Sequence, residues 1–298
     1  AGAAGAAEAR SRRARRLLVL LCAALAAAAL ASIGIGAVAI APGEMVAIVA
    51  GRLGLDLPVG SGAELVLLSI RLPRAVLALL VGGSLGVAGA VLQGLFRNPL
   101  ADPGLIGVSL GAAFAAATVI VLGAAASSRL PPWLLPWLLP LAAFGGGLAA
   151  TLAVQRIASR DGRTEVATML LAGVALNALA AAGIGLLIFV STDQQLRDLQ
   201  FWLLGSLGGV TWERLAPAAP MILLPTLLLL RYARPLDALL LGEADAFHLG
   251  FAIERTKRRV IVLAALAVGA GVALAGTIGF IGLVVPHVVR LAVGPDHR

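Results

Sequence analysis

Apolar residues fill most of the chain in long runs, and these runs predict its architecture. Stretches of Leu, Ala, Val, Ile and Gly are separated by shorter segments that contain Arg, Asp, Pro and Gly. A helix needs about 20 apolar residues to cross the hydrocarbon core of a bilayer. The pattern therefore predicts eight membrane-spanning helices, of which the last two are short. We place them at about residues 17–40, 75–95, 104–126, 134–155, 166–190, 215–230, 260–276 and 278–291.

One long polar segment, residues 231–259, interrupts this pattern. Its sequence is RYARPLDALLLGEADAFHLGFAIERTKRR, which holds four acidic and six basic residues. Leu239, Phe247 and other apolar residues recur there at roughly helical spacing, which predicts short amphipathic helices. Gly242 and Gly250 are expected where these helices stop and the chain turns. An ordered segment outside the bilayer is typical of a docking site; a solvated loop without a partner is the alternative.

A second interruption lies at residues 97–104, with the sequence RNPLADPG. Two prolines and a glycine within so few residues break a helix, because proline removes a backbone donor and clashes with the preceding turn. The segment predicts a sharp re-entry of the chain rather than a free loop.

A short internal repeat connects the two halves of the chain. Val81-Gly82 with Ala88-Gly89 is matched at the same spacing by Val268-Gly269 with Ala275-Gly276. If the eight spans alternate, the first copy runs inward and the second runs outward. The repeat therefore predicts a bundle with inverted internal symmetry.

Composition and charge narrow the class of protein and its orientation. Sixty per cent of the residues are hydrophobic and 13% are charged, whereas about 25% of the residues in a soluble domain are charged. We expect an all-α polytopic membrane protein, with residues 1–298 as one transmembrane domain. With the N-terminus inside, seventeen of the 23 Lys and Arg residues lie on the inner side. The positive-inside rule then places a tail, residues 1–16, and the segment 231–259 in the cytoplasm.

The N-terminal region has one alternative interpretation. Arg12 to Arg16 followed by an apolar run also resembles a secretory signal peptide. The run is longer than the apolar core of about 7–15 residues found in such peptides. We therefore expect a retained first helix.

Little in the sequence supports catalysis by this chain. No Asp or Glu falls inside a predicted span, whereas proton- and sodium-coupled carriers usually place ionisable groups there. The P-loop motif needs a lysine after glycine, but Lys257, the only lysine, follows Thr256. The histidines, His248, His287 and His297, are scattered, so we expect no metal site. The pattern favours a pore driven by a separate ATPase; a secondary carrier, a membrane-embedded enzyme and a structural protein are the alternatives.

Arg71 and Arg74 stand about one helical turn apart at the predicted outer mouth, with Pro73 opening the helix. Two such cations either extend to lipid headgroups or meet carboxylates on an external partner.

Six motifs in order resemble one known family. They are RLPR, AGAVLQGLFRNPLADPGLIGVSLGAA, LLAGVALNAL, WLLGSLGG, LLLGEADAFHLG and AGTIGFIGLVVPHVVRLAVGPDHR. Together they resemble the FecCD family, the permease subunits of ABC importers for iron-siderophores, haem and cobalamin, over about residues 60–298. The resemblance implies a ten-span subunit of the bacterial inner membrane. It implies a homodimer with two ATP-binding cassette subunits and a periplasmic binding protein, and no nucleic-acid partner. This chain ends after the eighth predicted span, so the last two spans of the family pattern are expected to be absent.

The resemblance also implies roles for individual residues. Arg71 and Arg74 would dock glutamates of the binding protein. The segment that couples to the ATPase would include Asp237, Leu241, Gly242, Glu243, Ala244, Phe247, Leu249 and Gly250. The cytoplasmic gate would include Asn98, Leu100, Glu165, Val166, Ala167 and Thr168. The pathway would be lined by Met169, Gly173, Asn177 and Ala181.

The substrate and cofactors are also expectations from the resemblance. FRNPLADPGLIGVS and WLLGSLGG look most like the haem-importing members, so haem is the expected substrate, with ferric siderophore and cobalamin as alternatives. ATP and Mg²⁺ would bind the partner ATPase, and this chain would bind no cofactor of its own.

Overall fold

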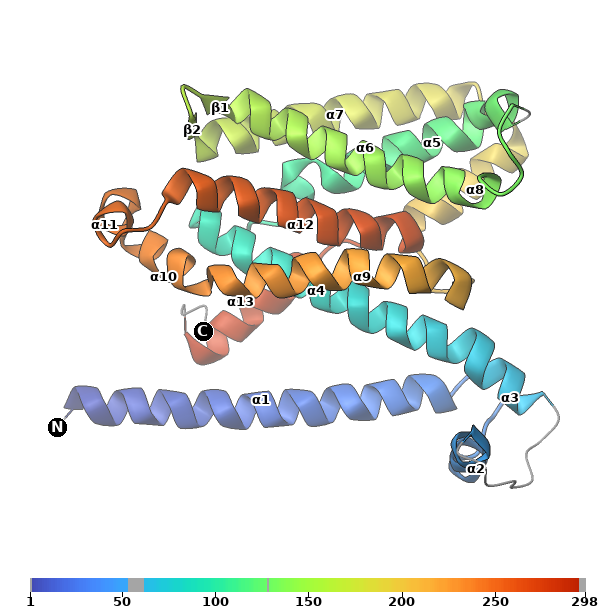
Figure 1. Cartoon of the computed structure of the whole chain (residues 1–298), viewed down its shortest axis with the longest axis horizontal. Coiled ribbons are helices and arrows are strands. Elements are labelled where there is room, and N and C mark those ends of the chain that lie inside the picture. The colour runs from blue at the N-terminus through green and yellow to red at the C-terminus, as the bar shows by residue number, and fades with distance from the viewer. Residues whose placement is uncertain (1, 53–61, 128, 295–298) are drawn as a thin grey trace.

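The computed structural model describes residues 2–52, 62–127 and 129–294. The chain is helical nearly throughout (Figure 1). Its α-helices are α1 (Gly2–Gly34), α2 (Pro42–Arg52), α3 (Ala63–Leu65), α4 (Leu72–Phe96), α5 (Val108–Ser127), α6 (Leu135–Ala158), α7 (Val166–Phe189), α8 (Asp193–Leu204), α9 (Trp212–Leu229), α10 (Ala233–Leu241), α11 (Glu243–His248), α12 (Ile253–Ala275) and α13 (Ile281–Val293). A π-helical turn, η1 (Val66–Arg71), joins α3 to α4, and 3₁₀ turns form η2 (Pro103–Ile106) and η3 (Leu230–Tyr232). Two short strands, β1 (Ser159–Arg160) and β2 (Arg163–Thr164), complete the described elements.

All eight apolar runs form helices. Within the described residues, six helical stretches are long and apolar enough to cross a bilayer: Arg12–Gly34, Ala63–Phe96, Leu135–Ala158, Val166–Phe189, Trp212–Leu241 and Ile253–Ala275. The runs predicted at 104–126 and 278–291 correspond to shorter apolar helices, Val108–Gly123 and Ile281–Val293. The segment expected as a tail, residues 1–16, continues the first span as one helix from Gly2.

The bundle is built around α4 and α12, which pack against each other. Figure 1 shows α5, α6 and α7 on one side of this pair and α9 and α13 on the other. α12 is the most buried of the long helices, because it contacts α4, α5, α6 and α9. α1 lies along the outside, and its apolar side chains that the structure describes are mostly exposed, as suits a helix facing lipid.

The two ends of the bundle differ. Figure 1 places the start of α1, the β1–β2 hairpin, α10 and α11 at one end, and α2, α3 and α8 at the other. The first end carries the segment 231–259 and the hairpin arginines, in agreement with the two-sided charge pattern of the sequence. We call it the α11 end.

The inverted repeat is visible in the backbone. α4 runs toward the α11 end and α12 runs away from it (Figure 1), and each is followed by a break and a shorter helix. The two breaks meet inside the bundle. A Cβ added at Gly282, in the first turn of α13, would lie 2.8 Å from Cδ of Pro103, where η2 begins.

The polar segment 231–259 is more helical than the sequence pattern indicated. α10 and α11 are the predicted amphipathic helices, and the chain turns after them at Gly242 (φ 124°) and Gly250 (φ 87°). The residues from Ile253 onward already belong to α12. The basic run that ends at Arg259 is therefore the first turns of a long helix rather than part of a loop.

Sequence reasoning missed the hairpin between α6 and α7. β1 pairs with β2 in antiparallel register, Ser159 opposite Thr164 and Arg160 opposite Arg163. Asp161 and Gly162 form the turn with positive φ values of 51° and 75°. Asp-Gly is a strong signal for such a two-residue turn, and it was available in the sequence.

Candidate functional site

The α10–α11 segment presents uncovered apolar side chains at the α11 end of the bundle. Leu241 is 66% exposed, Phe247 68% and Leu249 60%. Ala246, on the opposite face of α11, is fully buried. A patch of large apolar side chains on an ordered polar segment indicates a surface for a protein partner. Eight residues predicted to couple to the ATPase lie in or beside this segment, from Asp237 to Gly250.

Lys257 ties this segment to the rest of the molecule. Its side chain is 3% exposed, and its Nζ lies 2.9 Å from Oε1 of Glu243 in α11 and 3.0 Å from Oε1 of Glu254 in α12. Nζ also donates to the carbonyl oxygen of Thr164 in β2, at 3.0 Å. An ammonium group has three donors, and all three are used. A buried charge is tolerated only when it is paired in this way, so Lys257 joins α11, α12 and the hairpin at one point.

Glu254 strengthens the same junction from the other side. Its Oε2 accepts a hydrogen bond of 2.7 Å from the backbone N–H of Thr164. Thr164 is thus held through both its N–H and its carbonyl oxygen. The next residue, Glu165, is the N-cap of α7, so the junction sets where α7 begins.

The predicted gate residues form two local hydrogen-bonded turns. At the start of α7, Oγ1 of Thr168 donates to Oε2 of Glu165 at 2.6 Å. After α4, Oδ1 of Asn98 accepts from the backbone N–H of Leu100 at 2.9 Å. Leu100 is exposed. Val166 and Ala167 lie in the first turn of α7, half-buried and exposed respectively.

The predicted pathway residues are spaced four apart along α7 and differ in exposure. Met169 is 1% exposed and Gly173 is buried, whereas Asn177 is half-buried and Ala181 is exposed. A Cβ added at Gly173 would lie 1.9 Å from the carbonyl oxygen of Leu105, so only glycine permits this approach. Nδ2 of Asn177 donates to the carbonyl oxygen of Gly104 at 3.0 Å. Gly173 and Asn177 thus hold η2 against α7. The exposed face of α7 carries larger apolar residues, Leu171, Val174, Leu179 and Leu186.

Gly89 and Gln93 in α4 hold the break between α12 and α13 in the same way. A Cβ added at Gly89 in α4 would lie 1.8 Å from the carbonyl oxygen of Gly282. Nε2 of Gln93 donates to the carbonyl oxygen of Leu283 at 3.1 Å. In each pair a glycine admits one carbonyl and an amide four residues later binds the carbonyl of an adjacent residue, because residues i and i+4 share a helix face. We call these pairs the two glycine–amide clasps.

The clasps share a sequence pattern that the analysis of motifs missed. Residues 89–93 read GAVLQ and residues 173–177 read GVALN. In both clasps the amide oxygen, Oε1 of Gln93 and Oδ1 of Asn177, is buried without a hydrogen-bond partner in the described part of the chain. The common Gly-x-x-Leu-amide pattern was the signal that could have identified Gly89 and Gln93.

Asp102 shapes the re-entrant turn between α4 and α5. Its Oδ1 accepts a hydrogen bond of 2.7 Å from the backbone N–H of Gly104 and so caps η2. Desolvation of the half-buried carboxyl raises the pKa of Asp102 above its ordinary value, and the hydrogen bond from Gly104 only partly opposes this.

The two predicted docking arginines have different surroundings. Arg71 is buried, and its Nη1 donates to the carbonyl oxygens of Ile33 at 2.6 Å and Gly34 at 2.8 Å, while Nη2 donates to that of Val38. It therefore binds the last carbonyls of α1, which lack partners within the helix. Arg74, one turn later, is exposed.

Among the described residues, no group of three His, Cys, Asp or Glu side chains is placed to hold a metal ion. His248 is exposed in α11 and His287 is half-buried in α13. His297 lies outside the described residues.

Comparison with known proteins identifies the family. The family model of the FecCD transport family matches residues 20–298. The hemin transport system permease protein HmuU of Yersinia pestis is 47% identical over 231 residues, which cover 78% of this chain and 68% of that protein. The cobalamin import system permease protein BtuC of Halobacterium salinarum is 45% identical over 244 residues, 82% of this chain and 63% of that protein. The vitamin B12 import system permease protein BtuC of Escherichia coli is 42% identical over 236 residues, 79% of this chain and 69% of that protein.

A solved structure agrees in fold. A transporter described as being of the metal-chelate ABC type, in an inward-facing conformation, aligns with a TM-score of 0.77 at 30% sequence identity. The alignment covers 95% of this chain and 83% of that one. The matched segments span about two thirds of the length of the curated relatives.

These matches confirm the predicted family and the predicted helical membrane fold. Permease subunits of this family are transmembrane and non-catalytic, and ATP hydrolysis takes place in a separate subunit. The chain belongs to the FecCD transport family, as a multi-pass permease subunit of an ABC importer.

Proposed function

We propose that this chain is the permease of a binding-protein-dependent importer that moves haem across the bacterial inner membrane. The proposal rests on the sequence motifs that look like the haem-importing members and on the 47% identity to a hemin permease. The cobalamin permease of Halobacterium salinarum is 45% identical, so cobalamin is the second candidate. Ferric siderophore is the third. In each case the substrate would pass between two copies of the chain, and its iron or cobalt would not be ligated by this chain.

The observation that carries the proposed mechanism is the Lys257 junction. The α10–α11 segment, with Leu241, Phe247 and Leu249 uncovered, is the surface that would enter a cleft of the ATPase. Lys257 joins Glu243 of this segment to Thr164, which directly precedes Glu165 at the start of α7. Movement of the ATPase would therefore reach the gate at Glu165–Thr168 through an ion pair to a buried lysine rather than through a flexible loop.

α7 would form the pathway in a homodimer. Its exposed face is apolar, and in a symmetric dimer the same face of both copies would meet at the twofold axis. Ala181 is exposed and would lie nearest that face, whereas Met169, Gly173 and Asn177 would act by holding η2 against α7. Asn98 and Leu100 would then move together with α7, because η2 follows them in the chain.

The orientation follows from charge. With eight alternating spans, seventeen of the 23 Lys and Arg residues are assigned to the side of the N-terminus and of the segment 231–259, which supports a cytoplasmic location for both. The opposite end, with Arg74, would face the periplasmic binding protein. Because Arg71 is engaged with the carbonyls of α1, Arg74 is the more accessible of the two for a glutamate of that protein.

The test is reconstitution of this chain in proteoliposomes with its ATPase and binding protein, supplied in turn with haem, cobalamin or a ferric siderophore. We expect ATP-dependent uptake of haem and stimulation of ATP hydrolysis by the haem-loaded binding protein. Uptake of cobalamin but not of haem would make cobalamin the substrate and would leave the proposed ATP-driven mechanism unchanged. Uptake that collapses with the proton gradient at constant ATP would refute the ABC mechanism for this chain.

The coupling surface has a separate test. Replacing Ala244 by tryptophan places a bulky group on α11, where this side chain is exposed and takes no part in the Lys257 junction. We expect the ATPase to stop copurifying with the permease while the fold is kept. A normal complex would exclude this segment as the docking site.

A further inference from the structure

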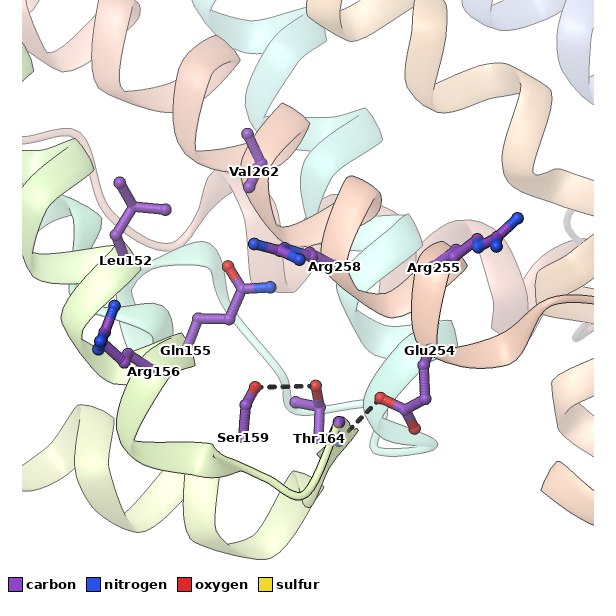
Figure 2. Close-up of a pocket in the computed structure, with 10 residues that line it drawn as sticks. Leu152, Gln155, Arg156, Ser159, Thr164, Glu254, Arg255, Arg258 and Val262 are labelled. Carbon is purple, nitrogen blue, oxygen red and sulfur yellow. Dashed lines mark hydrogen bonds between the residues drawn. The ribbon is translucent and has the colours of Figure 1, made fainter.

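A pocket of about 580 Å³ lies between α6 and α12 at the α11 end of the bundle. Figure 2 shows its lining: the guanidinium of Arg258 from α12 and the amide of Gln155 from α6 point toward one another across the space. Arg156 stands beside Gln155 on the α6 side, whereas Arg255 is turned away. One guanidinium and one amide therefore face each other across the pocket, and Arg156 adds a second positive charge to its lining.

These groups have no partner within the described chain. Gln155 is only 6% exposed, yet no hydrogen bond or ion pair within the described residues engages its amide or the guanidinium groups of Arg156 and Arg258. Glu254, the carboxylate that lines the pocket, is already bound to the N–H of Thr164 and to Lys257. Arg156 and Arg258 are exposed, and Gln155 lines the pocket beside them. The pocket is thus positively charged and holds an amide donor without a protein partner, which suits an oxyanion.

The other wall of the pocket is apolar. Leu152 precedes Arg156 by four residues in α6, and Val262 follows Arg258 by four residues in α12. Because α6 ends and α12 begins at this end of the bundle, both apolar residues lie deeper in the bilayer by about 6 Å, four residues at 1.5 Å rise. The ligand that matches both walls has an anionic head and an apolar tail.

We infer that this pocket binds the phosphate group of an anionic phospholipid. Gln155, Arg156 and Arg258 hold the phosphate oxygens, since planar guanidinium groups bind phosphate through paired hydrogen bonds. An acyl chain lies along Leu152 and Val262. Arg258 and Val262 also line a second pocket of about 600 Å³ between α9 and α12, which leaves room for the second chain.

The membrane is the source that fits this phosphate. Anionic lipids are concentrated in the cytoplasmic leaflet, and basic pockets between helices on that side bind their headgroups. The cytoplasmic placement rests on the orientation given under the proposed function. A soluble phosphate would leave the apolar wall unused.

The first experiment needs no variant. The purified, delipidated chain is titrated with phosphatidylglycerol, phosphatidylcholine or inorganic phosphate, and bound ligand is counted by native mass spectrometry. We expect phosphatidylglycerol to bind about tenfold or more tightly than phosphatidylcholine, a difference typical of a charged contact. Equal binding of the two lipids would overturn the proposal. Inorganic phosphate binding as tightly as phosphatidylglycerol would overturn the lipid assignment.

The second experiment locates the site. A double variant, Arg156→Gln with Arg258→Gln, is compared with a matched control on the hairpin, Arg160→Gln with Arg163→Gln. The control removes the same charge from exposed residues that do not line the pocket. We expect the pocket variant to lose the preference for phosphatidylglycerol and the control to keep it. A third variant, Gln155→Leu, should weaken binding of phosphatidylglycerol without changing the charge of the protein.

Equal losses in the pocket variant and the control would indicate diffuse electrostatic attraction and refute the site. Loss of ATPase copurification at unchanged lipid binding would assign the arginines to a protein partner instead. Neither readout depends on transport, so failure here is distinguishable from failure of the proposed function.

Discussion

Nζ of Lys257 lies 2.9 Å from Oε1 of Glu243, and this ion pair connects the α10–α11 segment to the membrane bundle. Lys257 is the one lysine in the sequence, and its side chain is buried although it sits in the first turns of a helix whose neighbouring arginines are exposed. The pair brings α11 against α12 and the hairpin, three elements whose relative positions decide where α7 begins.

We predict that Lys257→Met destabilises the protein. Two carboxylates and the carbonyl of Thr164 lose their common donor. Groups left without partners in this way cost about 1–3 kcal/mol. The measurement is thermal unfolding of the purified chain in detergent. Arg259→Met is the matched control, because Arg259 is exposed on the same helix and surface changes stay within about 0.5 kcal/mol. Equal unfolding temperatures for the two variants would show that the junction contributes nothing.

The glycine–amide clasps predict that alanine substitution has opposite effects on stability at two glycines of the same helix. Gly173→Ala places a Cβ 1.9 Å from the carbonyl oxygen of Leu105, whereas a Cβ at Gly185, also in α7, meets nothing within 4 Å. We expect Gly173→Ala to cost about 1–3 kcal/mol or more as an overpacked site. Gly185→Ala should leave stability unchanged or raise it by up to about 1 kcal/mol through helix propensity.

The second clasp repeats this test on α4. Gly89→Ala meets the carbonyl oxygen of Gly282 at 1.8 Å, whereas Gly86→Ala meets nothing within 4 Å. Thermal unfolding of all four variants measures both pairs. Tolerance of alanine at Gly89 or Gly173 would contradict the close packing of that helix on the break it holds.

Variants of Arg71 and Arg74 should affect different properties, Arg71 the stability of the fold and Arg74 the docking of the binding protein. Arg71→Ala removes the donors to the carbonyls of Ile33 and Gly34, and hydrogen bonds from charged groups are worth about 1.5–3 kcal/mol. We expect a lower unfolding temperature for this variant. Arg74→Glu should unfold like the wild type and lose stimulation of ATP hydrolysis by the binding protein. Unchanged stimulation in Arg74→Glu would exclude the docking role of Arg74.

Asp102 predicts a dependence of stability on pH. Desolvation raises its pKa in the folded state above the ordinary value of 3.8, so the folded protein binds the proton more tightly than the unfolded chain. The stability that this group contributes is therefore complete below pH 3.8 and is lost as the pH rises through the raised pKa. Asp102→Asn keeps an oxygen that accepts from the N–H of Gly104 but cannot ionise. The variant should therefore not lose stability as the pH rises. Unfolding followed from about pH 4 to pH 7 should be less pH-dependent in the variant; an identical pH profile would show that the carboxyl is not desolvated.

Much of the fold could be predicted because it depends on local pattern. Eight apolar runs became eight apolar helices, and Gly242 and Gly250 ended the short helices of the polar segment as expected. Asp193–Leu204, outside the spans, also forms a helix, α8, with a capping box between Thr192 and Gln195. In a bilayer each backbone group must be satisfied within its own helix, so the length of an apolar run and its capping residues determine where a helix lies.

The candidate site could be predicted only in part. The residues of the coupling segment and of the re-entrant turn were identified from motifs, because they are contiguous in the chain. Glu243 and Thr164 at Lys257, the clasps at Gly89 and Gly173, and the facing of Gln155 and Arg258 join residues far apart in the chain, such as Gln93 and Leu283. The local Gly-x-x-Leu-amide pattern marks one side of each clasp, but no local pattern identifies the distant residues that these side chains contact.

The sequence by itself determined that the chain spans a membrane, that its halves are related by an inverted repeat, and that a structured polar segment leaves the bilayer. These are consequences of solvation, since apolar runs partition into lipid and arginine-rich segments stay in the cytoplasm. Only the tertiary structure decided which polar groups are buried and what satisfies them. It paired Lys257 with Glu243, turned Arg71 toward the end of α1 and left Gln155 without a partner. The physical reason is that the cost of burying a polar group depends on the groups that folding brings against it.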